Sequence, residues 1–207
     1  MLVVLIGASG AGKTTWAATH FRAGEIVSSD ALRAATGTGP ADMAASADAF
    51  AVLELIVTAR LARRLTTVVD TVGQEPQRRR SWIERANVAG VPAIAVIMDT
   101  DPRLCAERNR GRDRRVPATV LTQQLRRMRE IDAELGGEGW DCVVTVTSRA
   151  DDVTPSRSVR PAEPAVVHPG TSGLGLVLQL SRFPVTDDLA GWLTSMALAA
   201  DQAGFAG

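Results

Sequence analysis

The stretch GASGAGKT, residues 7–14, decides the fold expected for this chain of 207 residues. It satisfies the pattern G-x-x-x-x-G-K-[ST], follows the apolar run Leu2–Ile6 directly, and leads into the helix-forming run TTWAATHF. A continuous apolar run of this length is typical of a strand that is buried on both faces of a parallel sheet. A strand, a glycine-rich turn and a helix in this order predict a P-loop, whose backbone N–H groups cradle phosphates.

The P-loop pattern also assigns roles to single side chains. We expect Lys13 to reach the β- and γ-phosphates of a nucleotide and the Thr14 hydroxyl to ligate Mg²⁺. Lys13 is the only lysine among 23 basic residues, which indicates a place where a compact ammonium is needed. The sequence thus predicts ATP, or another NTP, and Mg²⁺. The residues expected to bind the nucleotide here are Gly7, Ser9, Gly10, Ala11, Gly12, Lys13, Thr14 and Thr15.

Short apolar runs and helical patterns alternate along the first 150 residues. This order predicts an α/β fold of the P-loop NTPase class, with a parallel sheet sandwiched between helices. The further strands are expected at Glu25–Val27, Thr67–Val69, Ala93–Met98 and Cys142–Val146, and the longer helices at Asp42–Leu65, Gln77–Ala89 and Ala118–Leu135.

The composition changes after Arg149. Residues 154–173 contain four of the ten prolines, which is typical of an extended linker. We therefore expect a P-loop domain over residues 1–150, a linker over 151–173 and a strand–helix tail over 174–207. One strand and one helix cannot build a core of their own.

Asp30 ends the segment IVSSD, at the carboxyl edge of the expected sheet, where open α/β folds bind their ligands. Arg33, three residues later, falls on the same face of a helix. In a functional interpretation, Asp30 takes the proton of an attacking hydroxyl and Arg33 holds a phosphate of the acceptor. In a structural interpretation, Asp30 is a helix N-cap and Arg33 its solvated partner. The segment alone leaves both open.

Two further features belong to the expected site. Asp70 follows the third strand, a position where P-loop NTPases place a carboxylate that orients Mg²⁺ or its water. From Arg103 to Arg129 there are nine arginines and two acidic residues, a local net charge of +7. Such a segment is either a solvated helix surface or a lid over transferring phosphoryl groups. We favour an arginine-rich lid, in which Arg108, Arg112 and Arg115 share a side if the segment is helical.

The overall composition excludes several classes of protein. A net charge of zero, 45% hydrophobic and 22% charged residues indicate a folded chain without a long-range field for nucleic acid. Two cysteines without metal-ligand spacing fit a reducing compartment. The start MLVVLIG lacks a basic region and is too short to span a membrane. The sequence predicts a cytoplasmic protein without a membrane partner.

The motifs GASGAGKTT, VSSDALR, VVD and GVPAIAVIMDTDPRLCAERNRGRDRRVP, taken in order over residues 1–150, resemble the kinase domain of the polynucleotide kinases of phage and bacterial RNA-repair enzymes. That family phosphorylates 5′-hydroxyl ends, so the resemblance implies a nucleic acid or nucleotide acceptor. It makes Asp30 the general base, Arg33 a ligand of the acceptor phosphate and Asp70, with Thr14, a metal residue. The catalytic residues that it implies are Lys13, Asp30, Arg33, Arg108 and Arg112.

The chain departs from that family at Thr71-Val72-Gly73, which affects the expected acceptor contacts and not the ATP site. The same fold also serves kinases of small metabolites and nucleotides. Residues 173–207 resemble the first strand and helix of a luciferase-like flavin or deazaflavin oxidoreductase barrel. A third possibility is therefore a nucleotide-binding regulatory module of a fused or partner oxidoreductase.

Overall fold

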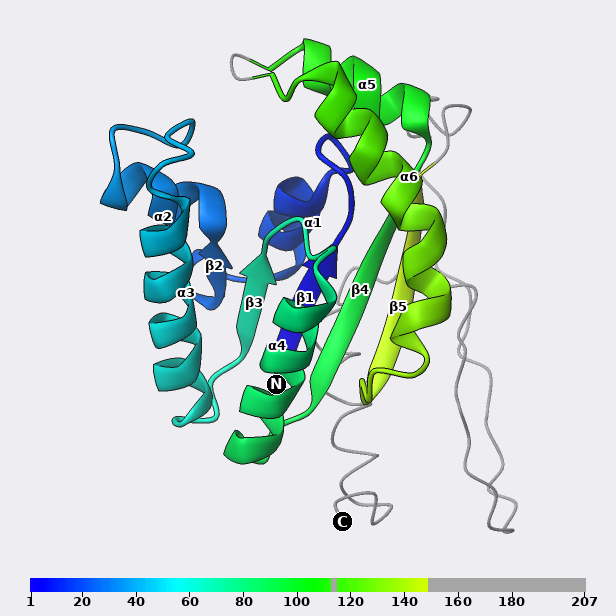
Figure 1. Ribbon diagram of the computed structural model, residues 1–207. Coiled ribbons are helices and arrows are strands. Elements are labelled where there is room, and N and C mark those ends of the chain that lie inside the picture. The colour runs from blue at the N-terminus through cyan, green and yellow to red at the C-terminus, as the bar shows by residue number, and fades with distance from the viewer. Residues whose placement is uncertain (113–114, 149–207) are drawn as a thin grey trace, which may run out of the picture.

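The fold is given by a computed structural model that describes residues 1–112 and 115–148 (Figure 1). Five parallel strands form one sheet in the order β2-β3-β1-β4-β5. They are β1 (Leu2–Ile6), β2 (Ile26–Ser28), β3 (Thr67–Asp70), β4 (Ala93–Thr100) and β5 (Cys142–Ser148). The helices are α1 (Lys13–His20), α2 (Ser29–Thr36), α3 (Ser46–Leu61), α4 (Pro76–Ala89), α5 (Pro102–Arg110) and α6 (Ala118–Leu135), with a 3-10 turn at Ala23–Glu25. The expected α/β fold is confirmed.

The expected linker at 151–173 and the tail at 174–207 lie outside the described residues. Within the described part, the helix expected at 42–65 is shorter than predicted. Its first turn is replaced by a loop, because the Asp42 carboxylate accepts hydrogen bonds from the backbone N–H groups of Thr38, Ala44 and Ala45. Its last turn ends before Arg64, which has a positive φ of 53°. Helix α6 has the predicted bounds.

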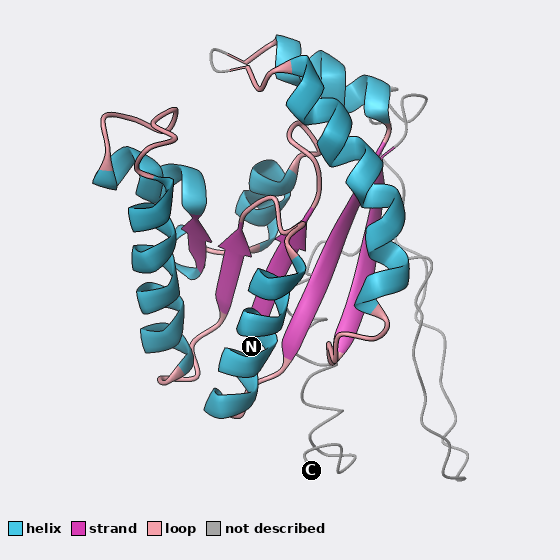
Figure 2. Cartoon of the chain, in the orientation of Figure 1, coloured by secondary structure: helices cyan, strands magenta, loops and turns pink. Residues whose placement is uncertain are grey.

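The two faces of the sheet carry separate cores, because successive side chains of a strand point to opposite sides. Leu2, Val4 and Ile6 of β1 pack with buried residues of α3, α4 and α6. Val3 and Leu5 face the other way and pack with the α1 side of the molecule. Figure 2 shows α3, α4 and α6 in front of the sheet and α1 behind it. Helices thus cover both faces of the sheet.

A buried arginine ties two of the front helices together. Arg79 of α4 is fully buried and forms ion pairs with Glu134 of α6 and with Glu138 at 2.7 and 2.6 Å. It also donates a hydrogen bond to the carbonyl of Gly73 at 3.3 Å. A buried charge is tolerated only when it is paired in this way. The contact therefore holds the loop that follows β3 against α6.

All strands run in the same direction, so their carboxyl ends lie at one edge of the sheet. The P-loop after β1, the start of α2, the loop after β3 and helix α5 after β4 gather there (Figure 1). This edge is where parallel α/β sheets bind ligands. Within residues 1–112 and 115–148, no helix is long and apolar enough to cross a membrane.

Candidate active site

The P-loop between β1 and α1 depends on two glycines with left-handed backbones. Gly10 has a φ of 84° and Gly12, the N-cap of α1, a φ of 93°. A Cβ atom at Gly10 would lie 2.4 Å from the carbonyl oxygen of Cys105, on α5. Only glycine fits this position without a shift of the backbone. The loop therefore wraps tightly around the start of α1, where helical N–H groups and the helix dipole favour an anion.

The ammonium of Lys13 lies across this loop. Its Nζ donates hydrogen bonds to the carbonyl oxygens of Gly7 and Ala8, at 2.7 and 2.9 Å. Desolvation by burial lowers the pKa of Lys13 to about 8, while the charge of Asp70 partly opposes this shift. Bound phosphates would favour the charged form of Lys13 far more than two carbonyls do. The geometry suits an ammonium that exchanges carbonyl partners for phosphate oxygens.

Thr14 and Asp70 lie together next to Lys13. The Thr14 hydroxyl donates a hydrogen bond of 2.8 Å to Oδ2 of Asp70, and Asp70 is only 5% exposed. Burial raises the pKa of Asp70, and the Thr14 hydrogen bond and the Lys13 charge oppose that shift. Mg²⁺ prefers hard oxygen ligands, and in nucleotide-binding proteins it takes one or two of them from the protein and others from the phosphates. A hydroxyl and a carboxylate this close together are ligands of that kind. The pair therefore fits the metal site expected from the sequence.

Asp30 and Arg33 form an ion pair at the start of α2. Nη1 of Arg33 lies 2.6 Å from Oδ1 of Asp30, and the same guanidinium bonds to Ser46 and to the carbonyl of Pro40. The N-cap of α2 is Ser28, so Asp30 stands inside the first turn. The charge of Asp30 raises the pKa values of both Lys13 and Asp70. The structure thus brings Asp30 within electrostatic range of the phosphate-binding residues.

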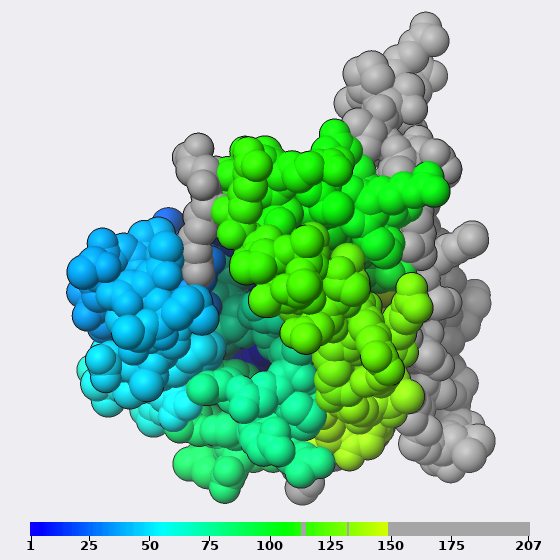
Figure 3. All heavy atoms as spheres, turned by 45° about the horizontal axis from the view of Figure 1, so that its top comes forward, coloured from blue at the N-terminus to red at the C-terminus, as the bar shows by residue number. Residues whose placement is uncertain are grey.

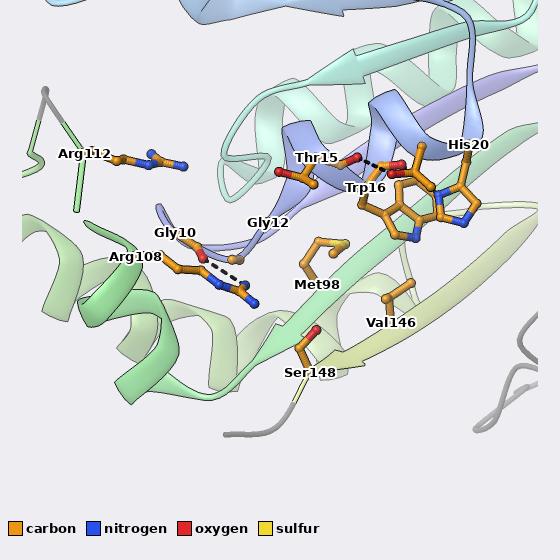
Figure 4. A pocket seen from close by; sticks show the side chains of 12 residues that line it. Gly10, Gly12, Thr15, Trp16, His20, Met98, Arg108, Arg112, Val146 and Ser148 are labelled. Atoms are coloured by element: carbon orange, nitrogen blue, oxygen red, sulfur yellow. Dashed lines mark hydrogen bonds between the residues drawn. The ribbon is translucent and has the colours of Figure 1, made fainter. Parts of the chain in front are cut away.

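A cavity of about 480 Å³ opens on the α1 side of the P-loop (Figure 4). Its volume is in the range of small-ligand pockets. Arg108 points along the P-loop and its Nη1 lies 3.4 Å from the carbonyl of Gly10. The residues lining the cavity are Gly10, Ala11, Gly12, Thr15, Trp16, Thr19, His20, Met98, Arg108, Arg112, Val146 and Ser148. The cavity thus joins the P-loop to an aromatic and apolar surface suited to a nucleoside.

The structure separates Arg115 from the other two arginines of the expected lid. Helix α5 ends at Arg110, and the Asn109 side chain bonds both the N–H and the carbonyl of Val116. The helical spacing expected of Arg108, Arg112 and Arg115 is therefore not formed. Arg108 and Arg112 line the cavity, whereas Arg115 does not. Arg112 also lowers the pKa of Lys13, which places its charge near the phosphate site.

A second hollow lies in front of the P-loop at the same edge of the sheet. Figure 3 shows it between the blue lobe, which contains α2 and the start of α3, and the green lobe of α5 and α6. Dark blue atoms from the start of the chain form part of its floor. The hollow thus reaches the start of the chain on the α2 side, whereas the cavity lies next to α1.

Sequence reasoning missed two side chains that bond the P-loop and a third that bonds one of these two residues. The Thr100 hydroxyl donates to the carbonyl of Ala11 at 2.9 Å, and Oε1 of Gln124 accepts from the Ser9 N–H at 2.8 Å. Gln74 donates to the carbonyl of Gln124 at 2.8 Å. These partners are 50 to 115 residues apart in sequence. A glutamine on a polar helix carries no local pattern that could have indicated such a contact.

The chain is similar to several kinases of known structure. Among solved structures, the chain is similar to a gluconokinase from Sinorhizobium meliloti 1021, with 21% identity, 70% of this chain and 81% of that chain covered, and a TM-score of 0.42. It is also similar to a shikimate kinase from Acinetobacter baumannii, with 20% identity, 71% and 84% covered, and a TM-score of 0.44. An APS kinase from Mycobacterium tuberculosis is also similar, with 19% identity, 76% of this chain and 89% of that chain covered, and a TM-score of 0.42. None of the curated proteins compared matches the chain.

A family model described as an AAA domain matches residues 2–131. The match covers more than half of the chain and includes the P-loop, Asp30, Asp70 and the arginines of α5. These are the elements that the geometry gathers at the carboxyl edge of the sheet. The chain belongs to the AAA domain family.

Proposed function

We propose that this protein is an ATP-dependent kinase that transfers the γ-phosphoryl group to a hydroxyl, with the 5′-hydroxyl of a polynucleotide as acceptor. The observation that carries the proposal is the position of Asp30. Its carboxylate is 63% exposed, is held by the buried Arg33, and acts electrostatically on Lys13 and Asp70. A protein that only binds or hydrolyses a nucleotide has no need of an acceptor base at this place.

The donor is bound by the P-loop and by the cavity next to α1. The phosphates of ATP meet the N-terminus of α1 and the ammonium of Lys13, and the nucleoside enters the cavity beside Trp16 and Met98. Arg108 and Arg112, at the rim of that cavity, then face the phosphates. This orientation directs the terminal phosphoryl group toward the hollow that α2 borders.

The Thr14 hydroxyl and the Asp70 carboxylate would hold Mg²⁺. When bound, this ion neutralises charge on the β- and γ-phosphates. Lys13 contributes a second positive charge at the same phosphates. Asp70 needs to be ionised for this role. Burial raises its pKa in the free protein, the charges of Lys13 and Arg112 oppose that shift, and a bound cation would oppose it further.

In the transfer step, Asp30 accepts the proton of the acceptor hydroxyl as its oxygen bonds to the γ-phosphorus. The bond from the γ-phosphorus to the bridging oxygen breaks at the same time, and ADP leaves with the electron pair. The products are the phosphorylated acceptor, ADP and a proton that Asp30 passes to water. Arg108 and Arg112 act on the charge of the transferring group, as guanidiniums do in other phosphoryl transferases. This last role is the proposed function of the arginine-rich lid.

A polynucleotide acceptor is supported by the order of the sequence motifs and by exposed basic residues on α6. Arg126 and Arg129 are exposed on α6, the second helix of the arginine-rich segment. Arg127, between them, is already paired with Glu130 and Glu134. We therefore assign backbone contacts to Arg126 and Arg129 and not to Arg127.

One observation favours a small acceptor instead. The guanidinium of Arg33 is 8% exposed and is engaged by Asp30, Ser46 and Pro40. In that arrangement the Arg33 guanidinium orients Asp30. To bind a phosphate of the acceptor, it would have to turn toward the hollow. A metabolite or nucleoside hydroxyl needs no such phosphate ligand, so a small-molecule kinase is the second candidate.

A panel of acceptors separates the two candidates. We expect γ-labelled ATP to label 5′-hydroxyl oligonucleotides. The double variant Arg126→Ala/Arg129→Ala should raise the KM for these oligonucleotides by about tenfold at low salt, and the increase should become smaller as the salt concentration rises. The KM for a mononucleoside should not change. Arg22→Ala/Arg63→Ala is the matched control, because both residues lie near the amino ends of strands. Labelling of small molecules alone would overturn the polynucleotide assignment.

A further inference from the structure

The Ser9 amide is already engaged by a side chain of a distant helix. Its N–H donates a 2.8 Å hydrogen bond to Oε1 of Gln124, in the middle of α6. The Ala11 N–H donates to the carbonyl of Ala8 inside the loop. The first half of the P-loop is therefore held by the protein itself, whereas Gly12–Thr15 present the start of α1 to phosphate. Gln124 is the side chain that fixes this first half.

Gln124 is itself part of a junction of three segments. Gln74, in the loop after β3, donates to the main-chain carbonyl of Gln124, and Val72 in the same loop accepts from the Gly7 N–H at 3.0 Å. Hydrogen bonds thus connect three segments pairwise: the loop after β3, the first half of the P-loop and α6. Arg79 fixes the same loop to the far end of α6 through Gly73, Glu134 and Glu138.

The junction lies away from the nucleoside cavity. The residues that line the cavity include Gly10, Ala11 and Gly12 but not Ser9, Gln74 or Gln124. The loop after β3 directly follows Asp70, the carboxylate that accepts from Thr14. The junction therefore meets the P-loop on the side of the terminal phosphate and the acceptor, not on the side of the base.

We propose that Gln124 is a positioning residue for phosphoryl transfer. Its side-chain carbonyl fixes the Ser9 amide and couples the terminal-phosphate end of the P-loop to α6. The proposal rests on the kinase function proposed above.

Gln124→Met tests the coupling, because methionine keeps the length and helix propensity of glutamine and removes the acceptor oxygen. Gln123→Met is the matched control on an exposed neighbour. In Gln124→Met we expect the Ser9 amide to exchange with solvent about tenfold faster, and both kcat and the preference for AMPPNP over ADP to fall about five- to tenfold. ADP affinity and Tm should match the control.

The outcomes are distinct. Equal losses of ADP and AMPPNP affinity would show that Gln124 supports the whole nucleotide site, and unchanged exchange and kcat would show that the bond has no effect; either result overturns the proposal. Wild-type protein that binds AMPPNP but phosphorylates no acceptor would overturn the kinase function. In that case the AMPPNP preference and Ser9 exchange still decide whether Gln124 couples α6 to the P-loop.

Discussion

Arg33 and Asp30 form an ion pair of 2.6 Å between a buried guanidinium and an exposed carboxylate. The Arg33 side chain is 8% exposed and that of Asp30 is 63% exposed. The buried partner is anchored by Ser46 and Pro40, so it sets the position of the exposed one. Asp30 is therefore oriented by the fold while it remains accessible to an acceptor.

The first prediction concerns Asp30→Asn. The variant keeps the size of the side chain and an oxygen that Arg33 can bond, but it cannot take a proton at neutral pH. We expect kcat to fall by about 10²–10⁴-fold, with ADP affinity within about twofold of wild type. Steady-state kinetics and ADP calorimetry measure both. Asp48→Asn, on α3, is the control; undiminished transfer in Asp30→Asn would leave Asp30 with a structural role only.

The pKa of Lys13 is directly measurable, because Lys13 is the only lysine. Lysine labelled with ¹³C at Cε gives one side-chain signal, which we expect to titrate at about pH 8 in the free protein. ADP should move the midpoint upward, since phosphates favour the ammonium. ADP affinity should therefore fall as the pH rises above about 8. A midpoint near the ordinary value of 10.5 in the free protein would contradict the placement of Lys13 inside the loop.

The lowered pKa of Lys13 also determines how its contribution to stability changes with pH. The lowered pKa means that the unfolded chain binds a proton at Lys13 more tightly than the folded chain does. The contribution of Lys13 to the free energy of unfolding therefore rises as the pH increases from about 8 toward 10.5. Comparison of urea unfolding for wild type and Lys13→Met over this range isolates that contribution.

The third prediction concerns Arg112. If its guanidinium bridges two oxygens of the transferring group, a lysine cannot replace it in the same geometry. We expect Arg112→Lys and Arg112→Ala to lower kcat by about 10²-fold or more, with smaller effects on the KM for ATP. Arg110→Lys, in the same segment but outside the cavity, should behave like wild type. A silent Arg112→Lys removes the lid role from this residue.

Arg79 gives a prediction for stability. Its removal leaves Glu138, which is only 6% exposed, without its main cationic partner. We expect Arg79→Met to lower the free energy of unfolding by about 3–5 kcal/mol, and Arg79→Met/Glu138→Gln to recover part of that loss. Arg78→Met removes surface pairs with Glu75 and Glu54 and a contact with the Phe50 ring, and should cost less, about 1–2 kcal/mol. Denaturant unfolding of the four proteins compares them, and equal losses for Arg78→Met and Arg79→Met would refute the burial argument.

The ion pairs of Arg79 with Glu134 and Glu138 also make the stability of the protein depend on pH in the acid range. Burial alone would raise the pKa of Glu138, but hydrogen bonds from Arg79 and Trp140 hold it below the usual value. A hydrogen bond from Arg127, with another from Arg79, lowers the pKa of Glu134. Their stabilisation is therefore present at neutral pH and is lost as the pH falls below about 4.3, the usual glutamate value. In Arg79→Met this acid dependence should be weaker.

The sequence predicted those parts of the site that depend on contiguous residues. The P-loop, with Lys13 and Thr14, follows from local geometry, because Gly10 and Gly12 make the turn and the next residues start a helix. Asp70 could be placed because it ends a strand that is apolar on both faces. The Asp30–Arg33 pair required only the three-residue spacing of a helix.

Contacts between distant segments could not be predicted in this way. Gln124 reaches Ser9 across 115 residues, and Arg79 reaches Glu138 across 59. Helical spacing also misplaced Arg115, because Asn109 bonds the main chain of Val116 and closes a turn where a longer helix was assumed. Each of these depends on tertiary packing, which a local pattern does not contain.

The central claim is that the γ-phosphoryl group goes to an acceptor hydroxyl with Asp30 as the base. Single-turnover reactions of γ-labelled ATP with a 5′-hydroxyl oligonucleotide, for wild type and Asp30→Asn, test it most directly when the label is followed in both the oligonucleotide and inorganic phosphate. We predict that wild type places the label on the oligonucleotide and that Asp30→Asn loses this product by about 10²-fold or more. Label that appears only as inorganic phosphate, at equal rates in both proteins and with every acceptor, would contradict the account.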